Sequence, residues 1–144
     1  MNVLVIHGPN LHMLGRRKPE IYGKGTLPEL NAEIRERAAA SGLKVRIFQS
    51  NCEGRIVDAI TAASGWADAL IINPAAYTHY SYAIRDAVEA LDVPAVEVHL
   101  SDISKREPFR RVSVIRPVCR ARFKGEGWRS YFKALDFCAA LEKE

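Results

Sequence analysis

Glu97 and His99 stand two residues apart near the end of an apolar run, a spacing that suits proton transfer. If residues 95–99 form a strand, both side chains point to one face, so the carboxylate can orient the imidazole. A carboxylate in this position favours the protonated ring, which gives a proton donor near neutral pH. The alternative is a buried histidine whose hydrogen bonds are satisfied by a neighbour.

A second group of polar residues lies in the segment 7–23, directly after the apolar run 3–6. Two prolines and three glycines interrupt this segment, so we expect a long loop and no regular element. Loops of this length in a small domain are more often functional or disordered than simple connections. Its polar residues are therefore the first candidates for a site: Asn10, Arg16, Arg17 and Tyr22.

Tyr22 is a candidate base only if a cation stands beside it, because a free phenol titrates near pH 10. Arg17 lies five residues earlier in the same loop and is the cation that the sequence offers. The alternative is a tyrosine that packs the loop while the arginine lies in solvent. Two further candidates, Asn73 and His79, flank a proline-containing loop that can present an amide and an imidazole to hydroxyl groups.

The elements that must position these residues alternate between strands and helices. Strands are predicted at 3–6, 44–49, 69–72, 95–99 and about 119–123, with 44–49 near a sheet edge because its residues alternate polar and apolar. Apolar stripes at helical spacing lie between them, at 27–38, 56–63, 84–91 and 131–141. Thr26 is expected to cap the first helix and Ser50 with Asn51 the second.

This alternation predicts an α/β fold with a five-stranded parallel sheet between two helix layers, a flavodoxin-like three-layer sandwich. We expect residues 1–144 to form a single catalytic domain. In such sheets, ligands bind beyond the carboxyl ends of the strands, near the point where strand order reverses. Asn10, Asn73 and His99 each follow or end a strand, so they are expected to converge on that rim.

The amino-acid composition limits the kinds of molecule that this protein is expected to bind. The formal net charge is +4, with many arginines after residue 105, but no aromatic-interleaved basic motif accompanies them. We therefore expect no nucleic acid, and an anionic small substrate is an equally good partner for this charge. No run approaches the roughly 20 apolar residues that span a bilayer, which predicts a cytoplasmic protein without membrane contact. Three widely spaced cysteines suit reduced thiols.

Several common motifs are missing from the sequence. It has no dinucleotide fingerprint, no GxxxxGK[ST] phosphate loop, no metal-spaced His and Cys cluster and no GxSxG elbow. Acid and base chemistry without a metal or organic cofactor remains. The alternative from another class is a flavodoxin-like module that binds an anionic metabolite or a flavin phosphate without catalysis.

The sequence resembles the type II 3-dehydroquinate dehydratases, or type II dehydroquinases, over nearly its whole length. The segments that carry the resemblance are GPNLHMLGRRKPEIYG at 8–23, FQSNCEG at 48–54, NPAAYTHYS at 73–81, IRDA at 84–87, VEVHLS at 96–101 and REPFR at 106–110. The resemblance implies anti elimination of water from 3-dehydroquinate, through an enolate, to give 3-dehydroshikimate. This reaction is shared by the shikimate pathway of aromatic amino acid biosynthesis and by quinate metabolism.

The resemblance also implies a role for each matching residue. Tyr22 would be the base, with Arg17 favouring its phenolate, and Asn10 would hold a water that stabilises the enolate oxygen. His99, oriented by Glu97, would protonate the departing hydroxyl. The implied substrate ligands are Asn73, His79 and Arg110 for hydroxyls, and Ser101 with the backbone at Leu100 for the carboxylate.

The family assembly implied by the resemblance is a trimer that associates into a homododecamer, with no cofactor and no metal. Asp86 resembles the family residue that reaches into the site of a neighbouring subunit.

Some residues depart from the family pattern. Asp102 stands where the family usually has asparagine, so we expect a negative charge near the carboxylate pocket that weakens substrate binding or selects another substrate. Lys18 replaces an acidic or amide residue and is expected to affect loop closure, and Arg55 replaces a glutamate. Near the C-terminus, four residues replace a more apolar, glycine-rich pattern, which puts the assembly contacts in question: Ala121, Arg122, Glu126 and Ser130.

Overall fold

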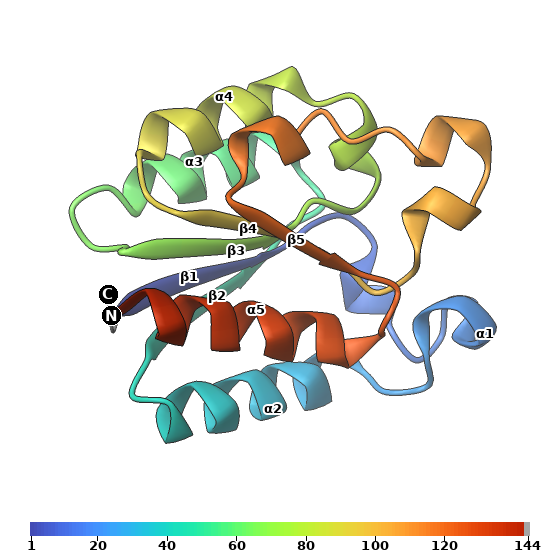
Figure 1. Cartoon of the computed structure of the whole chain (residues 1–144). Helices are drawn as coiled ribbons and strands as arrows, with labels where there is room; N and C mark the ends of the chain where they lie inside the picture. Colours follow the sequence, from blue (N-terminus) through green and yellow to red (C-terminus); the bar gives the residue numbers. More distant parts are fainter. Residues whose placement is uncertain (143–144) are drawn as a thin grey trace.

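The chain is organised around a five-stranded sheet in the order β2-β1-β3-β4-β5, in which every pairing is parallel (Figure 1). The computed structural model describes residues 1–142. The strands are β1 (Asn2–His7), β2 (Lys44–Gln49), β3 (Ala69–Asn73), β4 (Ala95–His99) and β5 (Ala121–Lys124). Strand order reverses direction between β1 and β3, as the predicted fold requires.

Helices cover both faces of the sheet. In Figure 1, α2 (Leu27–Ala40) and α5 (Trp128–Glu142) lie on one face, and α3 (Glu53–Ala62) and α4 (Tyr82–Leu91) lie on the other. The predicted three-layer α/β fold is confirmed. Short elements gather at the carboxyl end of the sheet: α1 (Pro19–Tyr22), η1 (Leu11–Met13), η2 (Ala75–His79), η3 (Ile103–Lys105) and η4 (Pro108–Arg110). A further short helix, η5 (Arg116–Val118), lies beside α4 and leads into β5.

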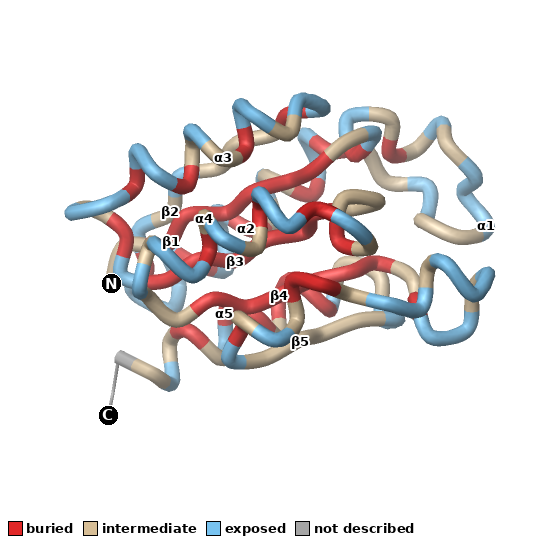
Figure 2. The backbone as a smooth tube through the Cα atoms, turned by 90° about the horizontal axis from the view of Figure 1, so that it is seen from above, coloured by how far each residue is buried: buried red, intermediate tan, exposed pale blue. Residues whose placement is uncertain are grey.

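The central strands are apolar on both faces because each face packs against a helix layer. Val3 and Val5 join the core beneath α2 and α5, whereas Leu4 and Ile6 join the core beneath α3 and α4. Figure 2 shows the resulting continuous burial along β1, β3 and β4. Strand β2 pairs only with β1, and its residues are exposed or partly buried, as its polar and apolar alternation predicts.

Three local predictions differ from the structure. The segment 7–23 is not fully irregular, because Pro19 begins the short helix α1 that carries Tyr22. Helix α3 has Cys52 at its N-cap position with no side-chain cap, so the predicted Ser50–Asn51 cap is wrong. The Ser50 hydroxyl instead accepts from the N–H of Cys52 itself, two residues later in the chain. Strand β5 covers 121–124 instead of 119–123.

The described cysteines Cys52, Cys119 and Cys138 are all free, the last two of them buried. Across residues 1–142, none of the helices combines the length and the apolar character that crossing a bilayer demands.

A buried polar cluster ties the end of β1 to α2 and α5. His7 is fully buried, with Nε2 2.8 Å from Asn31 Oδ1 and Nδ1 2.8 Å from Tyr131 Oη. Because an amide oxygen only accepts, Nε2 carries the proton, and Nδ1 accepts from the Tyr131 hydroxyl. Burial lowers the pKa of His7 to about 4, with Asn31 opposing this shift, so the ring is neutral at pH 7.

This depressed pKa makes His7 a source of acid sensitivity. Unfolding returns the ring to a pKa of about 6.5, so protons bind the unfolded chain first, and stability is lost as pH falls from about 6.5 to about 4. We expect His7 to account for about 3 kcal/mol of that loss, which His7→Asn removes because asparagine does not titrate. Urea unfolding across this pH range measures it. The exposed His12→Asn serves as control, and equal pH slopes for wild type and His7→Asn would contradict the prediction.

Candidate active site

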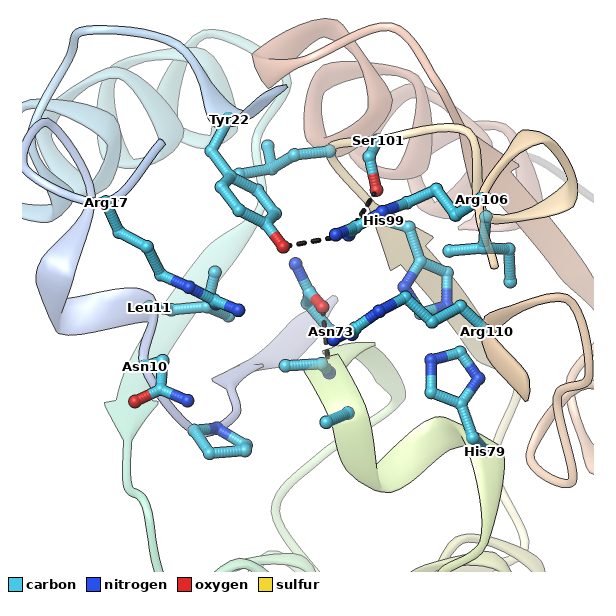
Figure 3. Close-up of a pocket in the computed structure, with 15 residues that line it drawn as sticks. Asn10, Leu11, Arg17, Tyr22, Asn73, His79, His99, Ser101, Arg106 and Arg110 are labelled. Atoms are coloured by element: carbon cyan, nitrogen blue, oxygen red, sulfur yellow. Dashed lines mark hydrogen bonds between the residues drawn. The ribbon is translucent and has the colours of Figure 1, made fainter. Parts of the chain in front are cut away.

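A pocket lies at the carboxyl end of the sheet, and its space, including the part open to solvent, amounts to about 490 Å³. Its walls come from the segments after β1, β3 and β4, together with α1 (Figure 3). The close approach of two of these segments requires Gly8, since a Cβ there would stand 2.6 Å from the Pro74 carbonyl oxygen. The three strand ends therefore meet around one cavity, as the topology predicts.

The charges of the pocket are all positive. Arg17, Arg106 and Arg110 line it, and none of the described lining residues is an aspartate or a glutamate. Figure 3 shows these three side chains directed toward the same space. Guanidinium groups bind carboxylates well, and a cleft with charges of one sign concentrates ligands of the other. The pocket is therefore suited to an anionic ligand.

Glu97 lies behind this pocket, fully buried, and contacts His99 in its wall. Its Oε1 accepts hydrogen bonds from Thr78 Oγ1, at 2.7 Å, and from the Ser113 hydroxyl. Its Oε2 lies 3.3 Å from His99 Nε2, within ion-pair distance. Burial alone would raise the pKa of Glu97, but His99 and the two hydroxyls more than offset this, so its pKa falls below the usual value.

This arrangement fixes the His99 ring. Because Nε2 is buried against the carboxylate, Nδ1 is the nitrogen that remains for a ligand in the pocket. The sequence-predicted pairing of an acid and an imidazole on one strand face is therefore present in the structure.

Tyr22 extends from α1 into the pocket, where two arginines surround it (Figure 3). Arg106 Nη1 donates to Tyr22 Oη at 2.8 Å, whereas Arg17 Cζ lies 4.8 Å from the ring centroid. A guanidinium at hydrogen-bond distance stabilises negative charge on the phenol oxygen. The sequence pointed to Arg17 as that cation; in the structure Arg17 lies over the ring and Arg106 holds the oxygen.

Sequence reasoning missed Arg106 because it lies 84 residues from Tyr22 in the chain. A signal was nevertheless present, since Arg106 opens the REPFR segment that carries part of the family resemblance.

Asn73 and His79 present defined hydrogen-bonding groups to the pocket. Asn73 Oδ1 accepts from the Ala75 N–H at 3.0 Å, which fixes the amide. His79 Nδ1 donates to the Val112 carbonyl at 2.7 Å, and burial lowers the pKa of this ring. His79 is therefore neutral near pH 7, with Nε2 left as an acceptor. Both residues line the pocket with groups that can bind hydroxyls.

The other predicted residues line the same pocket. Asn10 adopts a left-handed backbone conformation with φ 68°, and its N–H donates to Asn51 Oδ1 at 3.0 Å. Leu100 and Ser101 follow β4, and Ser101 Oγ lies 3.5 Å from Arg106 Nη1. Arg110 Nε donates to Glu107 Oε2 at 2.5 Å. The structure thus brings Asn10, Leu100, Ser101 and Arg110 to one cavity.

Asp86 is the predicted site residue that the structure does not bring to this pocket. It lies on α4 and is absent from the described lining. Its proposed reach into a neighbouring subunit stays a prediction. Among residues 1–142, no three His, Cys, Asp or Glu side chains are grouped so that they could hold a metal ion.

Asp102 does not place an unpaired charge at the pocket. Its Oδ1 lies 2.7 Å from Lys124 Nζ and accepts from the N–H and the hydroxyl of Ser104. Lys124 and Ser104 hold the pKa of this carboxyl well below its usual value, so it is ionised and paired. The residue is also absent from the pocket lining. The local cation offsets the charge that the sequence suggested would weaken substrate binding.

The remaining departures from the family pattern lie outside the pocket lining. Lys18 is the N-cap of α1, with φ 39°, and Arg55 is exposed on α3. Ala121 and Arg122 belong to β5. The Glu126 N–H donates to Ser130 Oγ at the start of α5.

Known proteins resemble this chain over most of its length. The family model for Dehydroquinase class II matches residues 1–139. A 3-dehydroquinate dehydratase of Roseiflexus castenholzii is 54% identical over 138 residues, which cover 95% of this chain and 87% of the relative. One of Pelotomaculum thermopropionicum is 49% identical over 141 residues, 98% of each chain.

The likeness extends to solved structures. The crystal structure of a type II dehydroquinase from Butyrivibrio crossotus superposes with a TM-score of 0.93 at 44% identity, covering 95% of this chain and 96% of the other. The residues 1–139 that match the family model include all those that line the pocket. The chain belongs to the class II dehydroquinases.

Proposed function

We propose that this protein removes water from 3-dehydroquinate to give 3-dehydroshikimate. The single observation that carries the proposal is a cationic pocket in which a tyrosine with a guanidinium at its oxygen shares the cavity with a histidine held by a buried glutamate. An elimination needs a base and an acid in one site, and an anionic substrate needs the arginines. The relatives named above carry the name 3-dehydroquinate dehydratase.

Tyr22 is the proposed base. Its phenolate takes the proton beside the substrate ketone, and Arg106 and Arg17 stabilise the charge that the oxygen carries before the transfer. The product of this step is an enolate. Asn10, at the rim of the pocket, is proposed to hold a water that donates to the enolate oxygen, a preorganised donor of the kind that lowers charged barriers.

His99 is the proposed acid. Its protonated imidazole gives a proton to the departing hydroxyl, which leaves as water as the enolate collapses to the enone. Glu97 holds the ring through Nε2 and stabilises its protonated form before the transfer. Both proton transfers then use groups of this chain, with no metal or organic cofactor. Because Tyr22 comes from α1 and His99 from β4, the two groups reach the substrate from separate walls.

The remaining lining residues are proposed to orient the substrate. Asn73, His79 and Arg110 bind its hydroxyls, since each brings a polar side chain to the cavity. Ser101 and the backbone at Leu100 bind its carboxylate, near the Arg106 guanidinium. Correct orientation of this kind contributes to rate because the reacting atoms are already aligned.

The decisive experiment is a spectrophotometric assay of the purified protein with 3-dehydroquinate, following the absorbance of the conjugated enone. Turnover by a colourless protein supports the proposal. Absence of turnover, together with absorbance above 400 nm from a bound flavin, would favour the alternative of a flavodoxin-like binding module.

Replacing either proton-transfer group should stop the reaction without unfolding the chain. We expect Tyr22→Phe and His99→Ala each to lower kcat by at least about 100-fold, the usual scale of general acid or base catalysis. Circular dichroism should stay close to wild type for both variants, whereas the melting temperature should stay close for Tyr22→Phe and fall for His99→Ala, which takes a buried partner from Glu97. A Tyr22→Phe enzyme that keeps most of its activity would disprove the assignment of the base.

The paired charge of Asp102 leads to a second expectation. Because Lys124 already offsets the carboxylate, Asp102→Asn should change kcat/KM for 3-dehydroquinate by less than about threefold. Lys124→Met, which leaves Asp102 unpaired, should raise KM by a larger factor. Steady-state kinetics of the two variants measure both effects. A gain of orders of magnitude in Asp102→Asn would instead indicate a divergent dehydratase with another preferred substrate.

We further propose that the subunits form trimers that associate into a dodecamer in the cytoplasm. Large apolar side chains are exposed near α4 and η4, where Asp86 also lies: Tyr80, Tyr82, Phe109 and Val112. Exposed apolar groups in one region are typical of subunit contacts. The free cysteines suit a reducing compartment.

Mixing two inactive variants tests the shared site. If Asp86 acts in a neighbouring subunit, Asp86→Ala and His99→Ala each lose activity, but hybrid oligomers contain sites with both residues intact. We expect refolded mixtures to recover part of the wild-type activity, and sedimentation to give the mass of twelve chains. Three results would contradict the shared site: mixtures as inactive as their parents, an Asp86→Ala protein that keeps its activity, or a monomeric protein.

A further inference from the structure

Glu97 has a second cationic neighbour besides His99. Arg122, on the adjacent strand β5, stands directly opposite Glu97 in the register of the two strands. Its Nη1 lies 3.8 Å from Glu97 Oε2, the same oxygen that lies 3.3 Å from His99 Nε2. The other oxygen is already occupied by the hydroxyls of Thr78 and Ser113. One carboxylate oxygen is therefore shared by an imidazole and a guanidinium.

Among residues 1–142, no group donates a hydrogen bond to this oxygen. Glu97 Oε2 and His99 Nε2 are both buried, and neither has a well-aligned hydrogen bond to a described residue. The interactions at Oε2 are thus governed by charge and distance more than by hydrogen-bond geometry. Because the Glu97 side chain is 0% exposed, its charges are weakly screened, while the Arg122 side chain is 26% exposed.

The two cations differ in one respect that matters for turnover. In the proposed reaction, His99 alternates between a charged and a neutral ring, whereas an arginine stays charged throughout. With His99 alone, Glu97 would lose its counter-charge at each proton transfer and become an isolated buried carboxylate, which is unfavourable. Arg122 supplies a counter-charge in both states and reduces the pull of Glu97 on the histidine proton.

We propose that Arg122 is a positioning residue for this reaction: it acts through Glu97 to limit how tightly His99 holds the proton that it must donate. The role of Arg122 in catalysis rests on the proposed dehydration. Its effect on the His99 proton does not, because that effect can be measured without substrate. A proton donor that binds its proton less tightly transfers it more readily to the departing hydroxyl.

The other charged and titratable groups around the pair do not take this role. Five of them line the pocket that His99 faces: Arg17, Tyr22, His79, Arg106 and Arg110. On the β5 side, Lys124 pairs with Asp102, and burial together with Glu97 raises the pKa of Cys119 to about 12, so that thiol is neutral. Arg122 is the one arginine or lysine of residues 1–142 that contacts the Glu97 carboxylate.

The direct test is hydrogen–deuterium exchange at the histidine Cε1 atoms, followed by mass spectrometry, which gives a titration midpoint for each histidine. Removing the cation in Arg122→Met should favour protonated His99 and raise its midpoint by about half to one pH unit. Arg122→Lys, which keeps the charge, should stay within about 0.3 units of wild type. Arg120→Met removes the same charge two residues away and should leave the midpoint unchanged.

His7 provides an internal control in every sample, because its ring nitrogens bond to Tyr131 and Asn31 and not to Glu97. Arg122→Gln, which is uncharged but keeps an N–H donor, should behave as Arg122→Met and replaces it if the methionine variant fails to fold. A His99 midpoint that is unchanged or lowered in the uncharged variants would overturn the inference.

Steady-state kinetics give the second readout. In Arg122→Met, the alkaline limb of the kcat profile should move up in pH by the same amount as the exchange midpoint, with KM changed less than about twofold. A loss of activity with an unmoved profile would mean a merely structural role and would overturn the inference. If wild type does not dehydrate 3-dehydroquinate, the proposed function fails, while the exchange midpoint still decides the role of Arg122.

Discussion

The buried carboxylate of Glu97 is the constraint on which the site depends. A charge in this position is tolerated only if its surroundings compensate for the water it has lost. The chain does so with groups from four separate segments: Thr78 after β3, Ser113 after η4, His99 on β4 and Arg122 on β5. Fixing one carboxylate therefore fixes the relative positions of the segments that form one side of the pocket.

The opposite side of the pocket is built differently. Tyr22 sits on a helix of four residues, and the contact that fixes its oxygen comes from Arg106, itself just after a short 3-10 helix. Helix α1 contains no fully buried residue, so the side that holds the base is suited to opening. Such a difference between the two sides suits a reaction in which the substrate enters the pocket first and the base then closes on it.

How much of this could be read from the sequence depends on the range of each interaction. Strands β1, β3 and β4 are evident as apolar runs, and the alternation of Glu97 and His99 follows from strand geometry alone, because both are local patterns. The Arg106 contact to Tyr22 and the Lys124 contact to Asp102 join residues 84 and 22 apart, and no local pattern encodes them. Helix α1 was missed for another reason: four residues are too few for a periodic pattern.

Two of the departures from the family pattern, Asp102 and Arg122, each lie beside a group of opposite charge. Asp102 adds a negative charge beside the substrate pocket, and Lys124 on β5 adds a positive one 2.7 Å away. Arg122, two residues earlier, points to the same strand face and reaches Glu97. The Asp102–Lys124 pair is partly exposed and contributes little to stability, so its value here is electrostatic. Arg122 and Lys124 on the edge strand β5 thus give Glu97 and Asp102 local counter-charges. The positive potential in the pocket is then set by its three arginines.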